Sequence, residues 1–299
     1  MKVTYCVMST GISRREMLNP PFMAYTHGME FMINECDASV DVVYAAHLRV
    51  LETAYSIAVK YRKPLVCWVW DVPDAHPAYM LLKNCQLVLS ASKYTADKLA
   101  ARGIKSTVVK YYIDTRALDN VPSTEYKTKS VIQIGRFVPS KRFDLSIVAT
   151  GVLGYLYTAV GYTGQHPREF TRCVYLAEAV NKRANFIPNA PRAVLARELR
   201  SALALVSPSV YEGWGMTPIE ATYCGVPVLI SDIPAHRETF RDAALYHEPD
   251  NTGDIVCKLQ QLIETPALRE EIVGACKPRI TEFTPQKFAE RWQEVMNTV

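Results

Sequence analysis

The sequence lacks the long apolar runs of a membrane-spanning protein, because no stretch of its 299 residues approaches about 18 uninterrupted apolar residues. Its first residues, MKVTYCVMSTG, hold too short an apolar run for a signal peptide and are typical of a first strand. The eight cysteines form no C-x-x-C pair, and most lie in apolar runs where a free thiol packs as a small hydrophobe. We therefore expect a cytoplasmic protein that contacts a membrane at most peripherally.

Several familiar ligand signatures are also absent. The net charge of +4 is too small to indicate a nucleic-acid partner, and basic and acidic residues are interspersed. Neither G-x-x-x-x-G-K-[ST] nor G-x-G-x-x-G follows a strand, which excludes a P-loop and the common dinucleotide fingerprint. No D-x-D occurs, and the six histidines form no close cluster. We therefore expect no metal ion and no cofactor.

The length and the pattern of apolar runs indicate two α/β domains. A chain of 299 residues exceeds what one hydrophobic core serves efficiently, and a cleft between two domains is a natural ligand site. Over the first third, helical segments alternate with the β-rich runs KVTYCVM, DVVYAA, PLVCWVW, LVLSAS and TVVKYYI. This alternation predicts a parallel sheet covered on both faces. One of the helices is predicted to start at the cap Ser92 and to end at Gly103.

A composition change marks the boundary between the two domains. The segment DNVPSTEYKTK lacks an apolar run and collects Pro, Ser, Thr and charges, so we place a linker at residues 121–129. The first domain then covers residues 1–120 and the second covers residues 130–283. The second domain repeats the alternation with SVIQIG, YLYTAVG, ANFIPN, ALALVSPS, VPVLISD and AALYHEP as strands.

The end of the chain changes character and predicts three successive helices. Asn251, Pro266 and the pair Thr284-Pro285 are typical helix starts. We expect the last helix, residues 284–299, to pack back toward the first domain.

Ligands of open parallel sheets bind at the carboxyl ends of strands, so the loops after SVIQIG and ALALVSPS are the candidates. In the first loop, Gly135 would allow a sharp turn, and Arg136 and Lys141 precede a helix whose N-terminus is positive. That combination suits a diphosphate. The alternative is an ordinary strand-to-helix loop with solvated cations.

The second loop, VYEGWGMTPIEATYCGVPVLISD, contains two glutamates. Its glycines can bring backbone amides close to a ligand, and Thr217-Pro218 would open the next helix. Glu212 stands at the end of a buried strand, where a carboxylate is typical of ligand contact. Glu220 has an alternative structural interpretation, because T-P-I-E is a capping box in which Glu220 would bond to the Thr217 amide.

GRFVPSK, followed by SPSVYEGWGMTPIEATYCGVPVLISDIPAHRET, resembles the C-terminal domain of the retaining GT-B glycosyltransferases of family four. The motifs G-R-x(4)-K and E-x(7)-E occur in the family's order within about residues 130–250. CQLVLSASKYTADKLAARGIKSTVVKYYIDTRAL in the first domain is consistent with the family. The resemblance implies a GT-B fold: two Rossmann-like, doubly wound parallel-sheet domains facing a cleft, with a helical C-terminal tail.

The resemblance also implies a role for each motif residue. Arg136 and Lys141 would neutralise the departing diphosphate, and Glu212 would contact the hydroxyls of the transferred sugar. The ribose hydroxyls would donate to Glu220. The other donor-binding residues implied are Gly135, Gly213, Trp214, Gly215, Met216 and Thr217, with Ile187 and Asn189 near the nucleobase.

The first domain departs from the family pattern. After the first strand, residues 8–31 offer only Gly11 and Gly28 instead of a glycine-rich loop, so Gly11 is the candidate contact. Family members tend to have a histidine near the sugar, and the corresponding region offers three candidates, His47, Asp71 and His76. Each histidine has the alternative of a surface or capping role. The neighbouring Trp68 and Trp70 suit either a sugar-stacking platform or the core of a two-faced sheet.

The function implied is a retaining, metal-independent glycosyltransferase, and a hexosyltransferase rather than a pentosyltransferase. Its co-substrate would be a nucleotide sugar such as a UDP- or GDP-sugar. The acceptor would be a hydroxyl of a glycan, a lipid-linked glycan or a small molecule. Two alternatives stay open: a non-catalytic nucleotide-sugar-binding protein, and a GT-B relative that hydrolyses or epimerises nucleotide sugars.

Overall fold

The computed structural model describes residues 2–6, 30–33, 39–72, 76–121, 130–164 and 166–299. The chain forms two compact units, unit 1 with Met1–Tyr112 and Phe283–Val299, and unit 2 with Ile113–Glu282. Most of the linker expected at 121–129 lies outside the described residues. The division between the units falls at residues 112 and 113, ahead of that linker.

Unit 1 is built on a six-stranded sheet in which all neighbouring strands run parallel. In spatial order the strands are β2 (Glu30–Ile33), β1 (Lys2–Cys6), β3 (Val42–Ala45), β4 (Leu65–Val69), β5 (Leu87–Ser90) and β6 (Thr107–Val108). Its helices are η1 (Leu48–Val50), α3 (Leu51–Tyr61), α4 (Tyr79–Leu82), α5 (Lys93–Ala100) and α14 (Pro285–Met296).

Five strands of unit 1 confirm the predicted alternation, and the sixth corrects it. The expected loop over residues 8–31 ends too late, because β2 begins at Glu30 and pairs with β1 along four residues. Four residues are too few to show a strand period in the sequence, and the pairing with β1 supplies the hydrogen bonds that define this strand.

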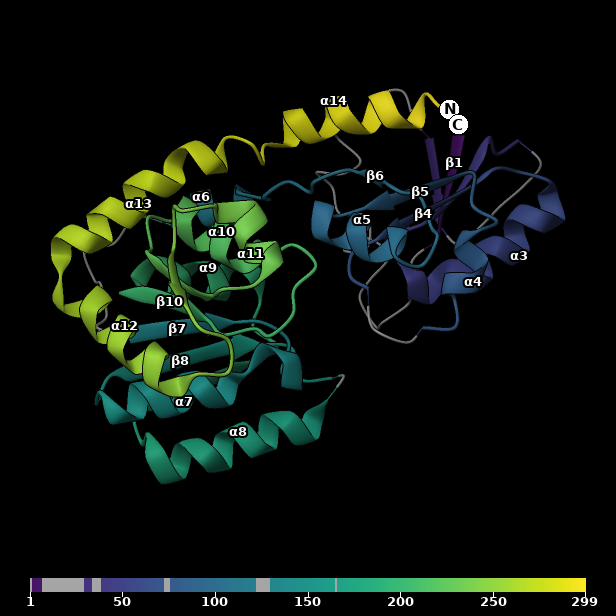
Figure 1. Cartoon of the computed structure of the whole chain (residues 1–299). Helices are drawn as coiled ribbons and strands as arrows, with labels where there is room; N and C mark the ends of the chain where they lie inside the picture. The colour runs from purple at the N-terminus through teal and green to yellow at the C-terminus, as the bar shows by residue number, and fades with distance from the viewer. Residues whose placement is uncertain (1, 7–29, 34–38, 73–75, 122–129, 165) are drawn as a thin grey trace. The chain divides into compact units, whose positions relative to one another are not determined.

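Aromatic side chains join α14, the last helix labelled in Figure 1, to the sheet of unit 1. The rings of Phe288 and Trp292 lie 5.8 and 5.7 Å from the ring of Trp68, which is only 1% exposed. Trp70 stacks on Trp68 at 4.5 Å and donates its indole N–H to the Ala46 carbonyl at 2.8 Å. Trp68 is therefore core packing, and the alternative of a sugar-stacking platform is wrong for this residue.

Unit 2 contains the second six-stranded parallel sheet. Its spatial order is β12 (Leu245–His247), β11 (Val228–Ser231), β10 (Ala204–Ser207), β7 (Ser130–Ile134), β8 (Leu156–Gly161) and β9 (Ala184–Pro188). Its helices are α6 (Arg116–Asp119), η2 (Pro139–Lys141), α7 (Phe143–Val152), α8 (Pro167–Val180), α9 (Arg192–Ser201), α10 (Met216–Tyr223), α11 (Pro234–Phe240), α12 (Thr252–Glu264) and α13 (Pro266–Ile280).

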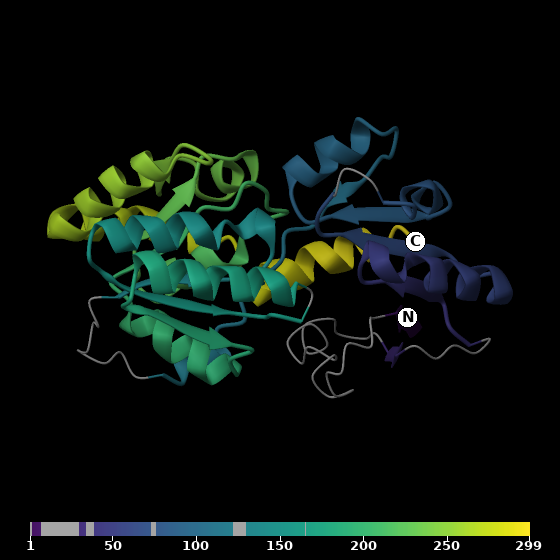
Figure 2. The same ribbon diagram turned by 90° about the horizontal axis from the view of Figure 1, so that it is seen from below.

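The helices of unit 2 cover both faces of its sheet. Figure 1 shows α7 and α8 on one face and α9 and α10 on the other, and α7 and α8 run side by side in Figure 2. The short helix α6 belongs to this unit because the Arg200 side chain on α9 donates to the Leu118 carbonyl at 2.7 Å. This contact explains why the unit begins before the expected linker.

The predicted helix starts are confirmed where a side chain caps them. Ser92 accepts from the amide of Thr95 at 3.0 Å, and Asn251 accepts from the amide of Asp254 at 3.0 Å. Thr284 caps α14 in the same way, and Pro285 is the first residue of that helix. These caps are local, so the sequence alone locates them.

The strand order creates a switch point in unit 2. The chain builds β7, β8 and β9 in one direction and then places β10 on the other side of β7. The loops that leave the carboxyl ends of β7 and β10 therefore start side by side at the point where open parallel sheets bind ligands, and the Val210 amide donates to the Ser140 carbonyl at 3.0 Å. Both candidate loops begin at this point of the sheet.

A glycine on β8 makes the close approach of the first loop possible. A Cβ at Gly161 would lie 1.7 Å from the Gly135 carbonyl oxygen, which is backbone and cannot rotate away. We expect Gly161→Ala to lower the free energy of unfolding by about 2 kcal/mol, as overpacking does in cores. Chemical denaturation measures the change. The matched control is Gly274→Ala on α13, where no atom lies within 4 Å and alanine should raise stability slightly; equal effects of the two substitutions would contradict the prediction.

Candidate active site

A buried glutamine holds the backbone of the loop after β7, which carries Arg136 and Lys141. Lys141 closes η2, and its backbone carbonyl accepts from the Gln133 side chain at 2.7 Å. The Gln133 oxygen accepts in turn from the Tyr157 hydroxyl at 2.9 Å, and both side chains are buried. Gln133 is not among the predicted site residues, although a polar residue inside the apolar run SVIQIG is a signal in the sequence. The network fixes the backbone that carries Lys141.

The turn of this loop differs from the expectation. Gly135 is not among the residues with positive φ, and its amide continues the sheet by donating to Val160 at 3.0 Å. The left-handed residue is Arg142, with φ of 47°, which separates η2 from α7. Arg136 is exposed, and the aliphatic part of Lys141 packs over Gly135. Gly135 therefore does not form the expected sharp turn, and a Cβ at this position would be in ordinary contact with the Lys141 side chain, 3.7 Å away.

The second loop reaches α10 through a glycine that does need its conformational freedom. Gly215 has φ of 82° and caps α10, so Met216 and Thr217 lie in the first helical turn. The side chain of Trp214 is only 4% exposed, and its carbonyl accepts from Thr239 at 3.1 Å. Contacts of Trp214 with a ligand are thus limited to its backbone.

Glu220 does not form the capping box. The helix starts two residues earlier than expected, at Met216 instead of Pro218, and its cap Gly215 has no side chain to complete the motif. The carboxylate of Glu220 instead pairs with Arg192, with Nη1 and Oε2 3.2 Å apart. A guanidinium in bidentate geometry is a stronger partner than a backbone amide, which explains the outcome. The capping interpretation of Glu220 is therefore wrong.

Lys141 and Glu212 meet at the switch point of unit 2. The Lys141 ammonium forms an ion pair and hydrogen bond with Glu212 Oε1, and the two side chains are 18% and 13% exposed. Burial by itself would raise the pKa of Glu212, but the charge of Lys141, aided by His236 and Ser209, holds that pKa below its usual value. The two loops predicted separately from sequence thus form one charged site.

A buried histidine lies beneath this site and was missed from sequence. His236 on α11 is fully buried, and its Nδ1 lies 2.8 Å from the Ser231 carbonyl, which can only accept. Nδ1 therefore carries the proton in the neutral ring. Its Cδ2 lies 3.1 Å from where a Cβ on Gly215 would stand, so the ring supports the glycine loop. Burial lowers the pKa of His236 to about 4.

The lowered pKa of His236 predicts that the protein loses stability in mild acid. Because the pKa of His236 falls from 6.5 to about 4 on folding, the unfolded chain binds a proton that the folded chain rejects between these values. Stability should fall by up to about 3 kcal/mol as the pH drops from about 6.5 to about 4. Burial lowers the pKa of His247 in the same sense. The pKa of Glu212 is also lowered, so its contribution to stability is lost only when the pH falls below about 4.5.

Urea denaturation between pH 7 and pH 5 measures this dependence. His236→Gln should flatten the slope of stability against pH, whereas the same substitution at the exposed His166 should leave it unchanged. An unaltered slope in the His236 variant would show that this ring is not the group responsible.

In unit 1 the structure brings two of the predicted residues together. His47 follows β3 and Asp71 follows β4, and His47 Nε2 lies 3.7 Å from Asp71 Oδ1. Nδ1 of His47 accepts from the Arg49 amide at 3.1 Å, so the neutral ring carries its proton on Nε2 and offers a donor. His76 has a local role, because its Nδ1 accepts from the Ala78 amide at 3.2 Å next to α4. Gly11 lies outside the described residues.

The proposed nucleobase residues stand at the end of β9. Ile187 lies within the strand, half-buried, and Asn189 follows with φ of 54°. The amide group of Asn189 bonds with Thr163 through both its nitrogen and its oxygen, at 3.1 and 3.2 Å. The side chain of Asn189 therefore fixes the loops after β8 and β9 to each other.

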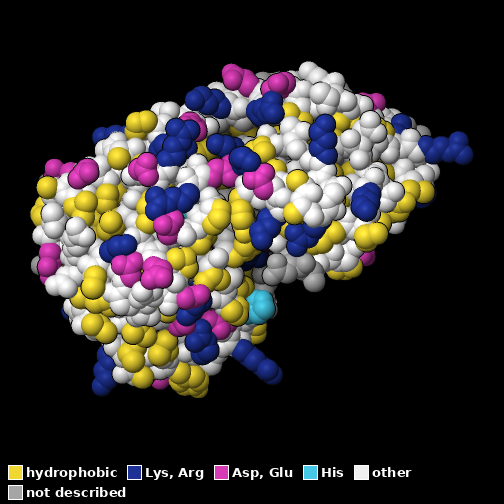
Figure 3. Space-filling view, viewed as in Figure 1, with side chains coloured by type: hydrophobic (Ala, Val, Ile, Leu, Met, Phe, Trp, Pro, Cys, Tyr) yellow, Lys and Arg dark blue, Asp and Glu magenta, His cyan; other side chains and the backbone are white. Residues whose placement is uncertain are grey.

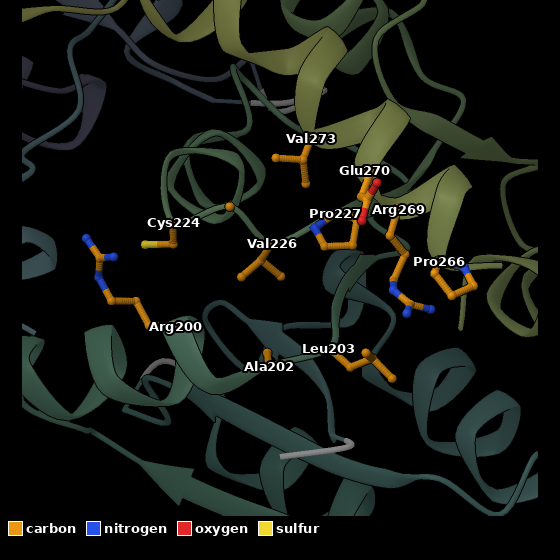
Figure 4. A pocket seen from close by; sticks show the side chains of 11 residues that line it. Arg200, Ala202, Leu203, Cys224, Val226, Pro227, Pro266, Arg269, Glu270 and Val273 are labelled. Atoms are coloured by element: carbon orange, nitrogen blue, oxygen red, sulfur yellow. The ribbon is translucent and has the colours of Figure 1, made fainter. Parts of the chain in front are cut away.

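A separate cavity of about 250 Å³ lies at the opposite edge of the same sheet (Figure 4). It is bounded by Leu203, just ahead of β10, and by Val226 and Pro227, just ahead of β11. These are the amino ends of the strands, so the cavity is remote from the Lys141 and Glu212 loops. None of the predicted site residues lines it.

Two further properties concern metals and membranes. Within the described residues, no three His, Cys, Asp or Glu side chains are grouped so that they could hold a metal ion. No helix in the described part of the chain combines the length and apolarity needed to cross a bilayer. On the face shown in Figure 3, basic and acidic side chains are interspersed.

Comparison with solved structures identifies the fold. Anabaena HepE, solved with UDP and glucose, matches with a TM-score of 0.84 at 14% identity, over 100% of both chains. Sucrose-phosphate synthase from Thermosynechococcus elongatus matches with a TM-score of 0.81 at 13% identity, over 99% of this chain and 98% of that one.

Sequence comparison identifies the family. The O-antigen chain mannosyltransferase RfbU of Salmonella typhimurium is 27% identical over 190 residues, which are 62% of this chain and 54% of the relative. The match thus spans about half the length of that relative. The family described as glycosyl transferases group 1 matches residues 115–277, more than half of the chain. The protein therefore belongs to the glycosyl transferases group 1 family and has the GT-B fold.

Proposed function

We propose that this chain transfers a hexosyl group from a nucleotide sugar to an acceptor hydroxyl, with retention at the anomeric carbon and without a metal ion. The observation that carries the proposal is the Lys141–Glu212 pair at the switch point of unit 2. A cation suited to phosphate and a carboxylate suited to sugar hydroxyls meet where parallel sheets bind ligands. The Salmonella mannosyltransferase and the UDP and glucose complex of HepE support a donor of this class.

Each site residue receives a role in this proposal. Lys141 and Arg136 bind the diphosphate and stabilise the negative charge that develops on it as the sugar departs. Glu212 accepts hydrogen bonds from the sugar hydroxyls, and the backbone from Gly213 to Thr217 lines the donor. Glu220 accepts from the ribose.

Donor binding would exchange partners within the charged pair. In the free protein Lys141 and Glu212 neutralise each other, so neither is left as an isolated buried charge. A bound diphosphate replaces Glu212 as the partner of Lys141, and sugar hydroxyls replace Lys141 as the partner of Glu212. The pair thus keeps the empty site stable and presents both groups to the donor.

The acceptor is a hydroxyl of a carbohydrate or glycolipid, with at most peripheral membrane contact and no nucleic acid. The O-antigen chain function in the name of the Salmonella relative supports a carbohydrate acceptor. In unit 1, the Nε2 donor of His47 beside Asp71 is the candidate for a hydroxyl contact.

One assay separates the proposal from its alternatives. The protein is incubated with UDP-, GDP- and ADP-sugars, with and without carbohydrate acceptors and with a chelator, and nucleotide release is followed. Acceptor-dependent, chelator-resistant release supports transfer, and the anomeric configuration of the product tests retention. Release without an acceptor indicates hydrolysis or another conversion of the donor, and binding without release under any acceptor indicates a binding protein.

A further inference from the structure

The second glutamate of the site has a partner that sequence analysis does not identify. Arg192, the first residue of α9, contacts both carboxylate oxygens of Glu220 on α10, with Nη1 to Oε2 at 3.2 Å and Nη2 to Oε1 at 2.5 Å. The Glu220 side chain is 6% exposed and the Arg192 side chain 39%. Nη2 also lies 3.5 Å from the Asp114 carbonyl oxygen. The guanidinium is therefore held at two places while one edge stays open to solvent.

This geometry leaves the carboxylate able to bind more. Two carboxylate oxygens offer about four acceptor positions, and Arg192 uses one on each oxygen. The remaining positions lie on both oxygens, which suits two adjacent hydroxyls. A planar fork also fixes the rotation of the carboxylate group, which a single point charge does not.

We propose that Arg192 is a positioning residue for the donor ribose: it holds the Glu220 carboxylate in its buried place and turns both carboxylate oxygens toward the ribose hydroxyls. The inference rests on the proposed function and adds a residue to it. Arg192 itself need not touch the donor, because it acts through Glu220. Without its partner, a carboxylate at this depth would turn or move toward water, and that movement takes acceptors away from the ribose.

A different result is expected if the Arg192–Glu220 ion pair has only a structural role. If Arg192 only holds α9 against α10, its loss weakens the whole site, and nucleotides with and without ribose hydroxyls lose affinity together. If it positions Glu220, the loss falls on nucleotides that carry the hydroxyls. The ratio of the two affinities therefore reports the positioning role.

The experiment is calorimetric titration of the full chain with UDP, GDP and ADP and with their 2′,3′-dideoxy counterparts. The native chain should prefer the ribonucleotide. Arg192→Gln should weaken binding of the ribonucleotide by about tenfold or more, and binding of the dideoxy compound by about twofold or less. Arg192→Lys, which keeps the charge but loses the fork, should also reduce the preference. Arg197→Gln, on the same helix and in an exposed pair with Glu198, is the matched control and should change neither.

The outcomes separate this inference from the function on which it rests. If the native chain binds none of the three diphosphates, the proposed function fails and the inference fails with it. If the native chain binds and prefers ribose, but both Arg192 variants keep the preference or lose both affinities equally, only the role of Arg192 is overturned. Thermal unfolding of each variant shows that it is folded, and Arg192→Lys alone decides the matter if Arg192→Gln does not fold.

Discussion

Lys141→Ala is expected to lower the rate of sugar transfer by about a thousandfold, because it removes a fixed positive charge from the place where the diphosphate departs. Lys141 is 18% exposed, so water replaces its charge poorly. Nucleotide release in the presence of donor and acceptor measures the effect. Lys258→Ala, which breaks an ion pair with Asp254 elsewhere in unit 2, is the control and should retain near-native turnover. Full turnover by the Lys141 variant would place the diphosphate elsewhere.

The same substitution should also destabilise the protein. The Glu212 side chain is only 13% exposed and loses its cation in this variant, and breaking a buried pair by removing one partner is costly. We expect Lys141→Ala to lower the free energy of unfolding by about 2 to 3 kcal/mol at pH 7. A loss of activity therefore has to be separated from a loss of folded protein.

Glu212→Gln carries the second large effect, a fall of about a hundredfold or more in turnover, because the amide cannot accept sugar hydroxyls on both of its terminal atoms. The double variant Lys141→Met, Glu212→Gln separates catalysis from stability. It removes both charges, so it should recover most of the stability that Lys141→Ala loses. It should recover none of the turnover.

Denaturation and turnover of the two single variants and the double variant complete this test. The contrary result is a double variant that regains both stability and turnover, since the pair would then be a structural element only. Glu220→Gln offers a milder comparison, because it should weaken nucleotide affinity more than it lowers turnover if Glu220 contacts the ribose.

Much of the architecture could be predicted because its signals are local. Every strand of unit 2 coincides with an apolar run of the sequence, and Ser92, Asn251 and Thr284 cap helices as their sequence context indicates. Each signal depends on a few consecutive residues and their preferred backbone geometry. The strand β2 escaped prediction because its four residues become a strand only by pairing with β1.

The sequence predicted which residues form the site, but it did not predict which of them contact each other. Lys141 and Glu212 stand out because cations and carboxylates after buried strands are typical of ligand sites. Glu220 stands out equally, yet its local context indicated a helix cap. In the structure, Glu220 pairs with Arg192, which lies 28 residues earlier in the chain. Local sequence offers a carboxylate several partners, and the fold, which places α9 and α10 on the same face of the sheet (Figure 1), decides which one reaches it.

The sequence by itself determined two parallel α/β layers of alternating strands and helices, the helix starts of the tail, and the two loops that carry the charged groups. Only the tertiary structure decided that Lys141 pairs with Glu212 across 71 residues, that Arg192 holds Glu220, and that Gln133 and His236 support these groups from the interior. The physical reason is one of distance along the chain. Backbone preference and apolar period act over a few residues, whereas Lys141 reaches Glu212 only because the strand order sets β10 beside β7 and brings their carboxyl ends to one edge.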